Sequence, residues 1–183
     1  MIMRADARRN YERLLAEAEA LISELGTDAP LEEIARRAEL GIGTLYRHFP
    51  TREALLEALL RERFDGLRAL AEELMNGPDA FESLAEWLRR FILGAGVYRG
   101  LAASMVDAIQ DESSSLHASC LSMREAAAEL LVRAQGAGAV RAEVTPVDVL
   151  VMANAVAWAM DRAPGDGEAG ERRLSMVLRG MRV

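Results

Sequence analysis

The chain has 183 residues, of which 51% are hydrophobic and 5% aromatic, and its formal net charge is −7. Abundant Ala, Leu, Glu and Arg without β-branched runs predict an all-α protein of about nine helices. No apolar run reaches the roughly 18 residues of a membrane span, which excludes a spanning protein. A single cysteine, Cys120, excludes an intrachain disulfide, and without a secretory signal at the N-terminus we expect a cytoplasmic protein.

The first helix is predicted over residues 5–25, where apolar side chains recur at helical spacing, and Gly26 ends it. We expect this helix to support a three-helix domain. Alternatively, its arginines reach the phosphates or the minor groove of a duplex, as basic arms do in other proteins. The arginines of this first helix and the residues before it are Arg4, Arg8, Arg9 and Arg13.

Residues 31–49 predict two short helices joined by a tight turn. Pro30 marks the start of the first helix, whose apolar face is Leu31, Ile34, Ala35 and Ala38. Gly41 and Gly43 open a second helix over residues 44–49, in which Leu45 and Phe49 face inward. The outward side chains are Thr44, Tyr46, Arg47 and His48. Hydroxyls, a phenol and cationic groups on one short helix suit a duplex major groove and its phosphates.

The run IARRAELGIGTLYRHFPTREALLEAL, residues 34–59, resembles the helix-turn-helix of the tetracycline-repressor (TetR) family of bacterial regulators. The most specific part is GTLYRHFPTREALL. Two residues depart from the family pattern: Glu39 replaces the usual glycine of the turn, and Gly41 replaces a frequent serine cap. A non-glycine residue with positive φ is uncommon, so we expect a strained or slightly reshaped turn.

The resemblance implies a DNA-binding transcriptional regulator, a repressor that binds a palindromic operator as a homodimer. Gly41, Thr44 and Arg47 are the expected base-side residues. The expected phosphate contacts are Tyr46, His48, Thr51 and Arg52. Thr51 is also the predicted cap of the next helix, whose first N–H groups suit a phosphate. We place the DNA-binding domain at residues 1–50 and a helical ligand-binding and dimerisation domain at residues 51–183.

The second domain is predicted as a series of further helices. A long helix reaches residue 75, a helix capped by Asp79 ends near residue 93, and others cover residues 101–110 and 116–134. Thr145 caps a helix over residues 147–160, with Pro146 in its first position and Asp148 three residues after the cap. A polar loop is expected over residues 163–170. The last helix shows one apolar stripe: Leu174, Val177, Leu178 and Met181.

The helix over residues 147–160 is apolar on almost every side, so we expect one face in the core and another on a partner subunit. In the resemblance, the last two helices form a four-helix bundle with their copies in a homodimer. Bulky residues predicted on inward faces indicate a pocket for a small apolar ligand, or simply a filled core. They are Trp87, Phe91, Met105, Met123, Met152 and Trp158, with Asn154 as a polar neighbour.

No catalytic motif, phosphate loop or cofactor signature is present, and we predict neither enzyme activity nor a cofactor. His117 and Cys120 share one helix face but lack further ligands, so a packed pair is expected rather than a metal site. Two other interpretations remain open. One is a helical dimeric interaction module that has lost DNA binding, which the acidic balance and Glu39 favour. The other is a helical enzyme acting on a small molecule, for which the sequence offers no reactive group.

Overall fold

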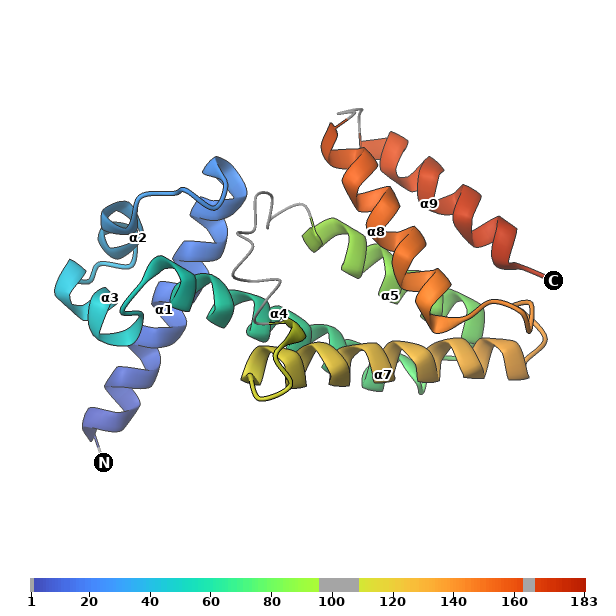
Figure 1. The fold of residues 1–183 in the computed structure, drawn as a ribbon, viewed down its shortest axis with the longest axis horizontal. Helices are drawn as coiled ribbons and strands as arrows, with labels where there is room; N and C mark the ends of the chain where they lie inside the picture. The colour runs from blue at the N-terminus through green and yellow to red at the C-terminus, as the bar shows by residue number, and fades with distance from the viewer. Residues whose placement is uncertain (1, 96–108, 163–166) are drawn as a thin grey trace. The chain divides into compact units, whose positions relative to one another are not determined.

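The computed structural model describes residues 2–95, 109–162 and 167–183, which form eight α-helices without a named strand (Figure 1). The all-α prediction is confirmed. The helix expected over residues 101–110 falls almost wholly outside the described residues. Contacts divide the chain into two compact units: residues 2–62 with 109–117, and residues 63–95 with the described part of 118–183. None of the described helices combines the length and apolarity that a bilayer span requires.

The first unit contains α1 (Ile2–Leu25), α2 (Leu31–Arg37), α3 (Ile42–His48) and the beginning of α4 (Arg52–Leu74). Gly26 ends α1 with a φ of 85°, a conformation that costs glycine little, and its N–H donates to Ile22 O at 2.7 Å. The core of this unit is apolar and drawn from all four helices. It includes Leu14, Ala18, Leu21, Ile22, Ile34, Ala35, Leu45, Phe49, Leu55 and Leu59.

Two hydrogen-bonding side chains organise the start of α4. Thr51 Oγ1 accepts the Ala54 N–H at 3.1 Å, as expected of an N-cap. The Arg52 guanidinium turns inward, and its Nη1 donates to Thr27 O at 2.9 Å and to Ala29 O at 2.5 Å. Arg52 therefore connects the α1–α2 loop to α4 through hydrogen bonds.

The second unit is built around Trp87 of α5 (Ala80–Ala95), which is fully buried. Its ring stacks on Phe91 with centroids 5.4 Å apart, and its Nε1 donates to Leu67 O of α4 at 2.9 Å. At the start of α5, Asp79 Oδ1 accepts the N–H groups of Phe81 and Glu82 at 2.8 and 3.0 Å, which confirms the predicted cap. The sequence therefore specifies both the beginning of α5 and the face that it buries.

Arg133 of α7 (Ser115–Gly136) ties that helix to the α4–α5 connection. Its Nη1 lies 3.3 Å from Leu74 O and 3.2 Å from Ser83 Oγ, and its Nη2 donates to Gly77 O. One half-buried guanidinium thus satisfies carbonyl groups that a helix end leaves without intrahelical partners.

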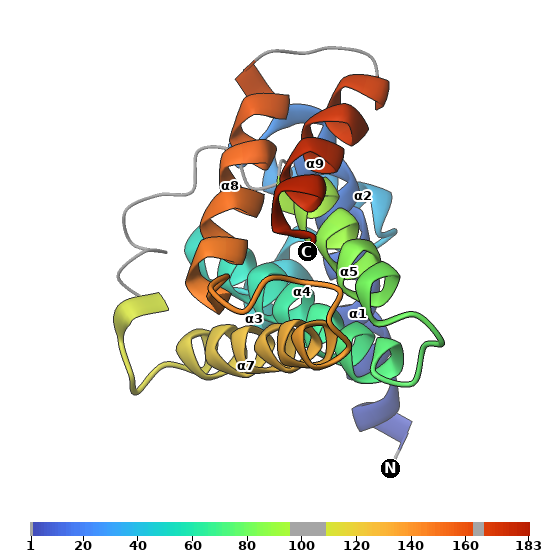
Figure 2. The same ribbon diagram turned by 90° about the vertical axis from the view of Figure 1, so that its right-hand side faces the viewer.

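The last two helices, α8 (Pro146–Arg162) and α9 (Gly167–Met181), lie side by side (Figure 2). Thr145 and Asp148 form the predicted reciprocal cap: Asp148 N–H donates to Thr145 Oγ1 at 3.2 Å, and Thr145 N–H donates to Asp148 Oδ2 at 3.0 Å. The Thr145 hydroxyl donates to Asp148 Oδ2 at 2.6 Å, and this bond and the one from the Thr145 N–H lower the pKa of the Asp148 carboxyl group. The structure corrects the loop expected over residues 163–170, because α9 already begins at Gly167.

Gly170, the last residue of the expected loop, is helical in the structure. It is buried in α9, and a Cβ added there would lie 2.5 Å from Met160 Cε of α8. A larger residue at this position would therefore need the flexible end of the Met160 side chain to move, and the glycine lets that side chain pack against α9.

Candidate nucleic-acid interface and ligand cavity

The turn between α2 and α3 is closed by two backbone hydrogen bonds. Leu40 N–H donates to Ala35 O at 2.9 Å, and Glu39 N–H donates to Arg36 O at 3.0 Å. This pairing is the Schellman arrangement, in which the two residues after the C-cap satisfy carbonyls of the last helical turn. The chain leaves α2 at Ala38 and enters α3 through Gly41, whose φ of −72° and ψ of 146° are those of an N-cap.

Glu39 occupies the left-handed position of this turn with a φ of 54°, and it is the one non-glycine residue with positive φ among those described. Residue 39 thus has the uncommon positive φ on which the expectation of a strained turn is based. Its carboxylate Oε2 lies 2.9 Å from Arg13 Nη2 of α1. Because both Schellman hydrogen bonds form, Glu39 does not reshape the turn that sets α3.

One face of α3 is buried and the other is open to solvent. Leu45 and the following Phe49 are almost fully buried, as predicted, and hold the helix against the unit. Tyr46 is 45% exposed, Arg47 is exposed, and Thr44 is half-buried. The helix begins at Ile42, two residues earlier than predicted, and Ile42 adds an exposed apolar side chain that the sequence analysis did not include.

Gly41 and Gly43 lie at the exposed beginning of α3, and no heavy atom lies within 4 Å of a Cβ built at either one. Neither glycine is needed for internal packing, so both leave the helix end accessible to a large partner. Arg47 Nη2 lies 3.4 Å from Thr44 Oγ1, a long hydrogen bond along the same face. Among the described residues Arg47 has no carboxylate partner, so its charge is available to an external anion.

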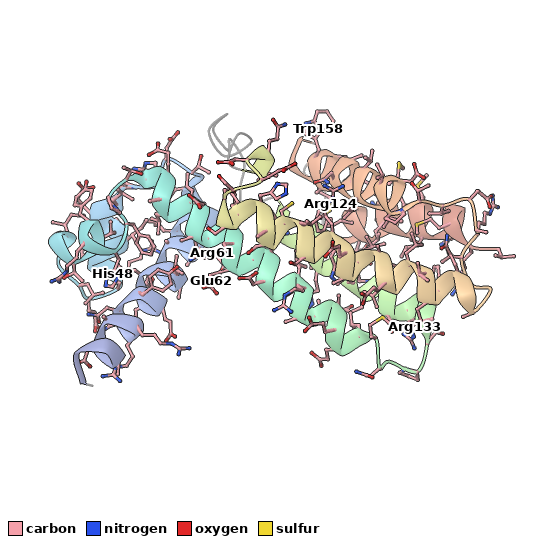
Figure 3. The ribbon with its side chains drawn as sticks, turned by 60° about the horizontal axis from the view of Figure 1, so that its bottom comes forward. His48, Arg61, Glu62, Arg124, Arg133 and Trp158 are labelled. Atoms are coloured by element: carbon pink, nitrogen blue, oxygen red, sulfur yellow. The ribbon has the colours of Figure 1, made fainter. Side chains whose placement is uncertain are left out.

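His48 is half-buried and lies beside the aromatic rings that fix the end of α3 (Figure 3). Its ring centroid is 6.1 Å from that of Tyr11 and 6.2 Å from that of Phe49. Tyr11 itself lies 5.1 Å from Phe49, and its hydroxyl accepts Arg61 Nη2 at 3.0 Å. The cluster connects α1, α3 and α4 within the first unit and sets how α3 ends.

Several other arginines near this motif form ion pairs within the chain. Hydrogen bonds from Arg36 and Arg37 to Glu33 lower the pKa of its carboxyl group to about 2. They outweigh partial desolvation, which alone would raise this pKa. Arg37 also pairs with Glu24 at 2.9 Å and lowers the pKa of that carboxyl group. The exposed arginines of α1 are paired too, Arg8 with Glu12 and Arg9 with Asp6. The positive charge of α3 is therefore local on an acidic chain.

The second unit contains a cavity of about 320 Å³ bounded by α4, α5, α7 and α8. Phe91, Met123 and Asn154, all predicted pocket residues, line it. Trp87 lies behind Phe91 and supports the wall through ring stacking. The remaining lining residues were not predicted from the sequence. They are Phe64, Cys120, Arg124, Val147, Leu150 and Val151.

Met152 and Trp158 do not lie on the inward face that the sequence predicted. They are 46% and 62% exposed, and neither lines the cavity. Because α8 is apolar on nearly all sides, its periodicity cannot select the buried face, which is formed by Val149, Ala153, Val156 and Ala157. Met105 lies outside the described residues.

No group of three or more histidine, cysteine or acidic residues is positioned to hold a metal ion in the described part of the chain. His117 Nδ1 lies 2.8 Å from Ile109 O, which is the hydrogen bond of a packed histidine. Burial raises the pKa of the Cys120 thiol, so the thiol stays protonated at neutral pH.

The two halves of the chain match two family models. Residues 14–59 match the model "Bacterial regulatory proteins, tetR family", and residues 79–183 match "Transcriptional regulator SbtR-like, C-terminal domain". The chain belongs to the TetR family. It is accordingly a DNA-binding regulator of transcription, as the motif in residues 34–59 predicts.

Solved structures agree with the family assignment over nearly the whole chain. A TetR transcriptional regulator of Streptomyces coelicolor, SCO0520, is 35% identical, with 94% of this chain and 98% of that one covered and a TM-score of 0.76. A TetR regulatory protein of Mycobacterium vanbaalenii is 30% identical, covers 99% of both chains and has a TM-score of 0.69. A sequence relative, the HTH-type transcriptional regulator SAR0097 of Staphylococcus aureus, is 32% identical over 75 residues. That match spans 39% of each of the two chains.

Proposed function

We propose that this TetR-family regulator is a ligand-responsive repressor that binds a palindromic operator as a homodimer. The observation that carries the proposal is the exposed face of α3, where Tyr46 and Arg47 stand beside two glycines with open space around them. A helix presenting such groups fits a major groove, in which hydrogen-bonding side chains read base edges and phosphate contacts fix the position. Residues 1–50 are proposed as the DNA-binding domain and residues 51–183 as the domain for ligand binding and dimerisation.

Each exposed group of the motif has a proposed role. Gly41, Thr44 and Arg47 face the bases, because a guanidinium suits guanine and the glycine permits close approach. Ile42 adds an apolar contact of the kind that a thymine methyl group accepts. Tyr46 contacts phosphate, as does Thr51 at the start of α4, where free N–H groups favour an anion.

His48 and Arg52 complete the proposed phosphate contacts. Both are half-buried and already hold neighbouring segments, His48 beside Tyr11 and Arg52 through the carbonyls of Thr27 and Ala29. Arg52 therefore contributes positive charge to binding, and both residues also position α3 and α4.

The proposed dimer forms through α8 and α9, whose outer faces are strongly apolar. Met152 of α8 is 46% exposed and Met176 of α9 is 73% exposed. A groove of about 560 Å³ runs between the two helices and is lined almost entirely by apolar side chains, including Met152 and Met176. A contiguous apolar surface of this kind is typical of a protein interface.

The dimer is tested by introducing charge on this face. Met152→Glu and Met176→Glu are expected to give monomers in sedimentation-velocity experiments, because a carboxylate in an apolar interface is not solvated. Val132→Glu is the matched control, since Val132 is 63% exposed but lies on α7. Dimers that persist in both α8–α9 variants contradict the proposed interface.

The proposed mechanism couples the cavity of the second unit to DNA binding. A ligand that binds one conformation of the dimer more tightly than the other shifts the population away from the spacing that fits the operator. A chromosomal operator places this action in the cytoplasm. Thermal-shift screening is expected to identify a ligand that also releases DNA. A ligand that stabilises the fold but leaves operator affinity unchanged contradicts the coupling.

The operator is tested by hydroxyl-radical footprinting on the DNA upstream of the protein's own gene. The expected result is two related protected half-sites whose centres lie about 10 base pairs, or a multiple of that, apart. A single protected half-site, or protection without symmetry, contradicts a dimer on a palindrome.

A further inference from the structure

Among the described residues, the lining of the second unit's cavity includes one positively charged group and no acidic one. Its polar lining consists of Arg124 of α7, Asn154 of α8 and the Cys120 thiol, and the remaining lining residues are apolar. Arg124, labelled in Figure 3, is exposed. It has no carboxylate partner among the described residues. An apolar chamber with a single unpaired cation at its rim is suited to an amphiphilic anion rather than to a purely apolar molecule.

We propose that the ligand of this cavity is a small organic monocarboxylate whose carboxylate binds Arg124 and whose apolar body fills the chamber. This proposal rests on the proposed function, in which the cavity is the effector site. It also changes the expectation of an apolar ligand, because the lining offers a guanidinium that a hydrocarbon leaves unused.

The apolar walls define the body of the ligand. Phe64 and Phe91 are buried aromatic side chains on α4 and α5, and Met123 is a flexible buried one on α7. A volume of about 320 Å³ lies near the lower end of the range for ligand sites, so the body is compact. A single aromatic ring or a short acyl chain fits these walls.

The polar rim defines the head group. The guanidinium of Arg124 presents N–H donors in the planar arrangement that a carboxylate accepts in pairs. Asn154 donates to Leu150 O at 2.9 Å through one of its two amide hydrogens, so its second hydrogen and its carbonyl oxygen remain for a ligand. Because both residues are exposed, the carboxylate keeps part of its hydration and does not need to be neutralised for binding.

The thiol of Cys120 does not oppose this arrangement. Burial raises its pKa, so it lines the cavity as a neutral group. A neutral thiol neither repels an anion nor acts as a nucleophile toward the ligand.

A second arginine-containing groove provides a matched control. It has a volume of about 670 Å³, lies between α5 and α9, and includes Arg179 together with acidic residues. Glu82 and Glu171 in that groove already pair with neighbouring arginines, for example Glu171 with Arg89 at 3.5 Å. Arg179→Met therefore makes the same change of charge as Arg124→Met on the same full-length protein, but away from the proposed site.

The test compares acids with their neutral amides by isothermal titration calorimetry. Benzoate and hexanoate are expected to bind the full-length protein, whereas benzamide and hexanamide bind at least tenfold more weakly. Arg124→Met is expected to weaken carboxylate binding by about ten- to a hundredfold, the range for a hydrogen bond to a charged group, and Arg179→Met to leave it unchanged. The thermal midpoint of ligand-free Arg124→Met should equal that of the unmodified protein, which separates lost binding from lost folding.

The proposal is overturned if amides bind as tightly as acids, if Arg124→Met binds acids normally, or if none of these acids binds at millimolar concentration. Release of footprinted DNA by the acids is measured separately. Acids that bind through Arg124 without releasing DNA support the anion site and contradict only the effector role of the cavity.

Discussion

Replacing Glu39 with glycine is expected to stabilise the protein relative to replacing it with alanine. Glu39 has a φ of 54° and carries a Cβ in a position where glycine is normally found. Removing that Cβ relieves about 1 kcal/mol of left-handed strain, which alanine retains. The ion pair to Arg13 is lost in both variants, and the Glu39 side chain is 83% exposed, so this pair contributes about 0–1 kcal/mol.

The two substitutions together isolate the backbone effect. Glu39→Ala measures the loss of the ion pair with the strain unchanged, and Glu39→Gly measures the same loss with the strain relieved. Urea denaturation followed by circular dichroism is expected to give a free energy of unfolding about 1 kcal/mol higher for Glu39→Gly than for Glu39→Ala. Equal stability, or a more stable alanine variant, refutes the assignment of strain to this residue.

DNA binding provides a second readout of the same turn. Because the Leu40 and Glu39 N–H groups already make both Schellman hydrogen bonds, glycine should not move α3. Glu39→Gly is therefore expected to keep the operator affinity of the unmodified protein.

Three further predictions concern stability. Trp87→Phe leaves Leu67 O without its buried donor and is expected to cost about 1–3 kcal/mol in urea denaturation, and an unchanged midpoint contradicts the role of this bond. Thr145→Ala removes the α8 cap and is expected to cost about 1 kcal/mol, whereas Thr145→Ser keeps its stability. The pKa of Glu33 is lowered to about 2, so below its ordinary value the unfolded chain binds more protons than the folded one. The unmodified protein is therefore expected to have a higher free energy of unfolding than Glu33→Gln above about pH 4.5, and this difference should disappear as the pH falls to about 2. A difference that does not change with pH contradicts the prediction.

Helix boundaries were predictable wherever a side chain or a backbone requirement specifies them locally. Asp79 and Thr145 cap their helices as expected, and Gly26 ends α1 with a positive φ. The same local reasoning failed at Gly170, because the glycine serves close packing against Met160. Local sequence alone cannot distinguish these two uses of glycine.

The outward face of α3 was predictable because buried Leu45 and Phe49 leave its other residues on the open side. The cavity was predicted only in part. Met152 and Trp158 were predicted to face inward but lie at the surface. Because α8 is apolar on opposite sides, its sequence does not show which side is buried, and only packing selects that side. The sequence did not identify Arg124 as a cavity residue. A charged residue next to a buried one on a helix is normally a solvent-facing residue, and nothing in the sequence distinguishes Arg124 from such residues.

The reading of DNA by α3 is tested most directly by a salt titration of binding to the DNA upstream of the protein's own gene. The logarithm of the affinity is expected to fall linearly and steeply with the logarithm of the salt concentration, as counterions are released from the phosphates. Tyr46→Ala should weaken binding, whereas Arg90→Ala, an exposed change on α5, should not. Affinity that does not depend on salt, no footprint, and a Tyr46→Ala variant that behaves like the unmodified protein would together contradict the account.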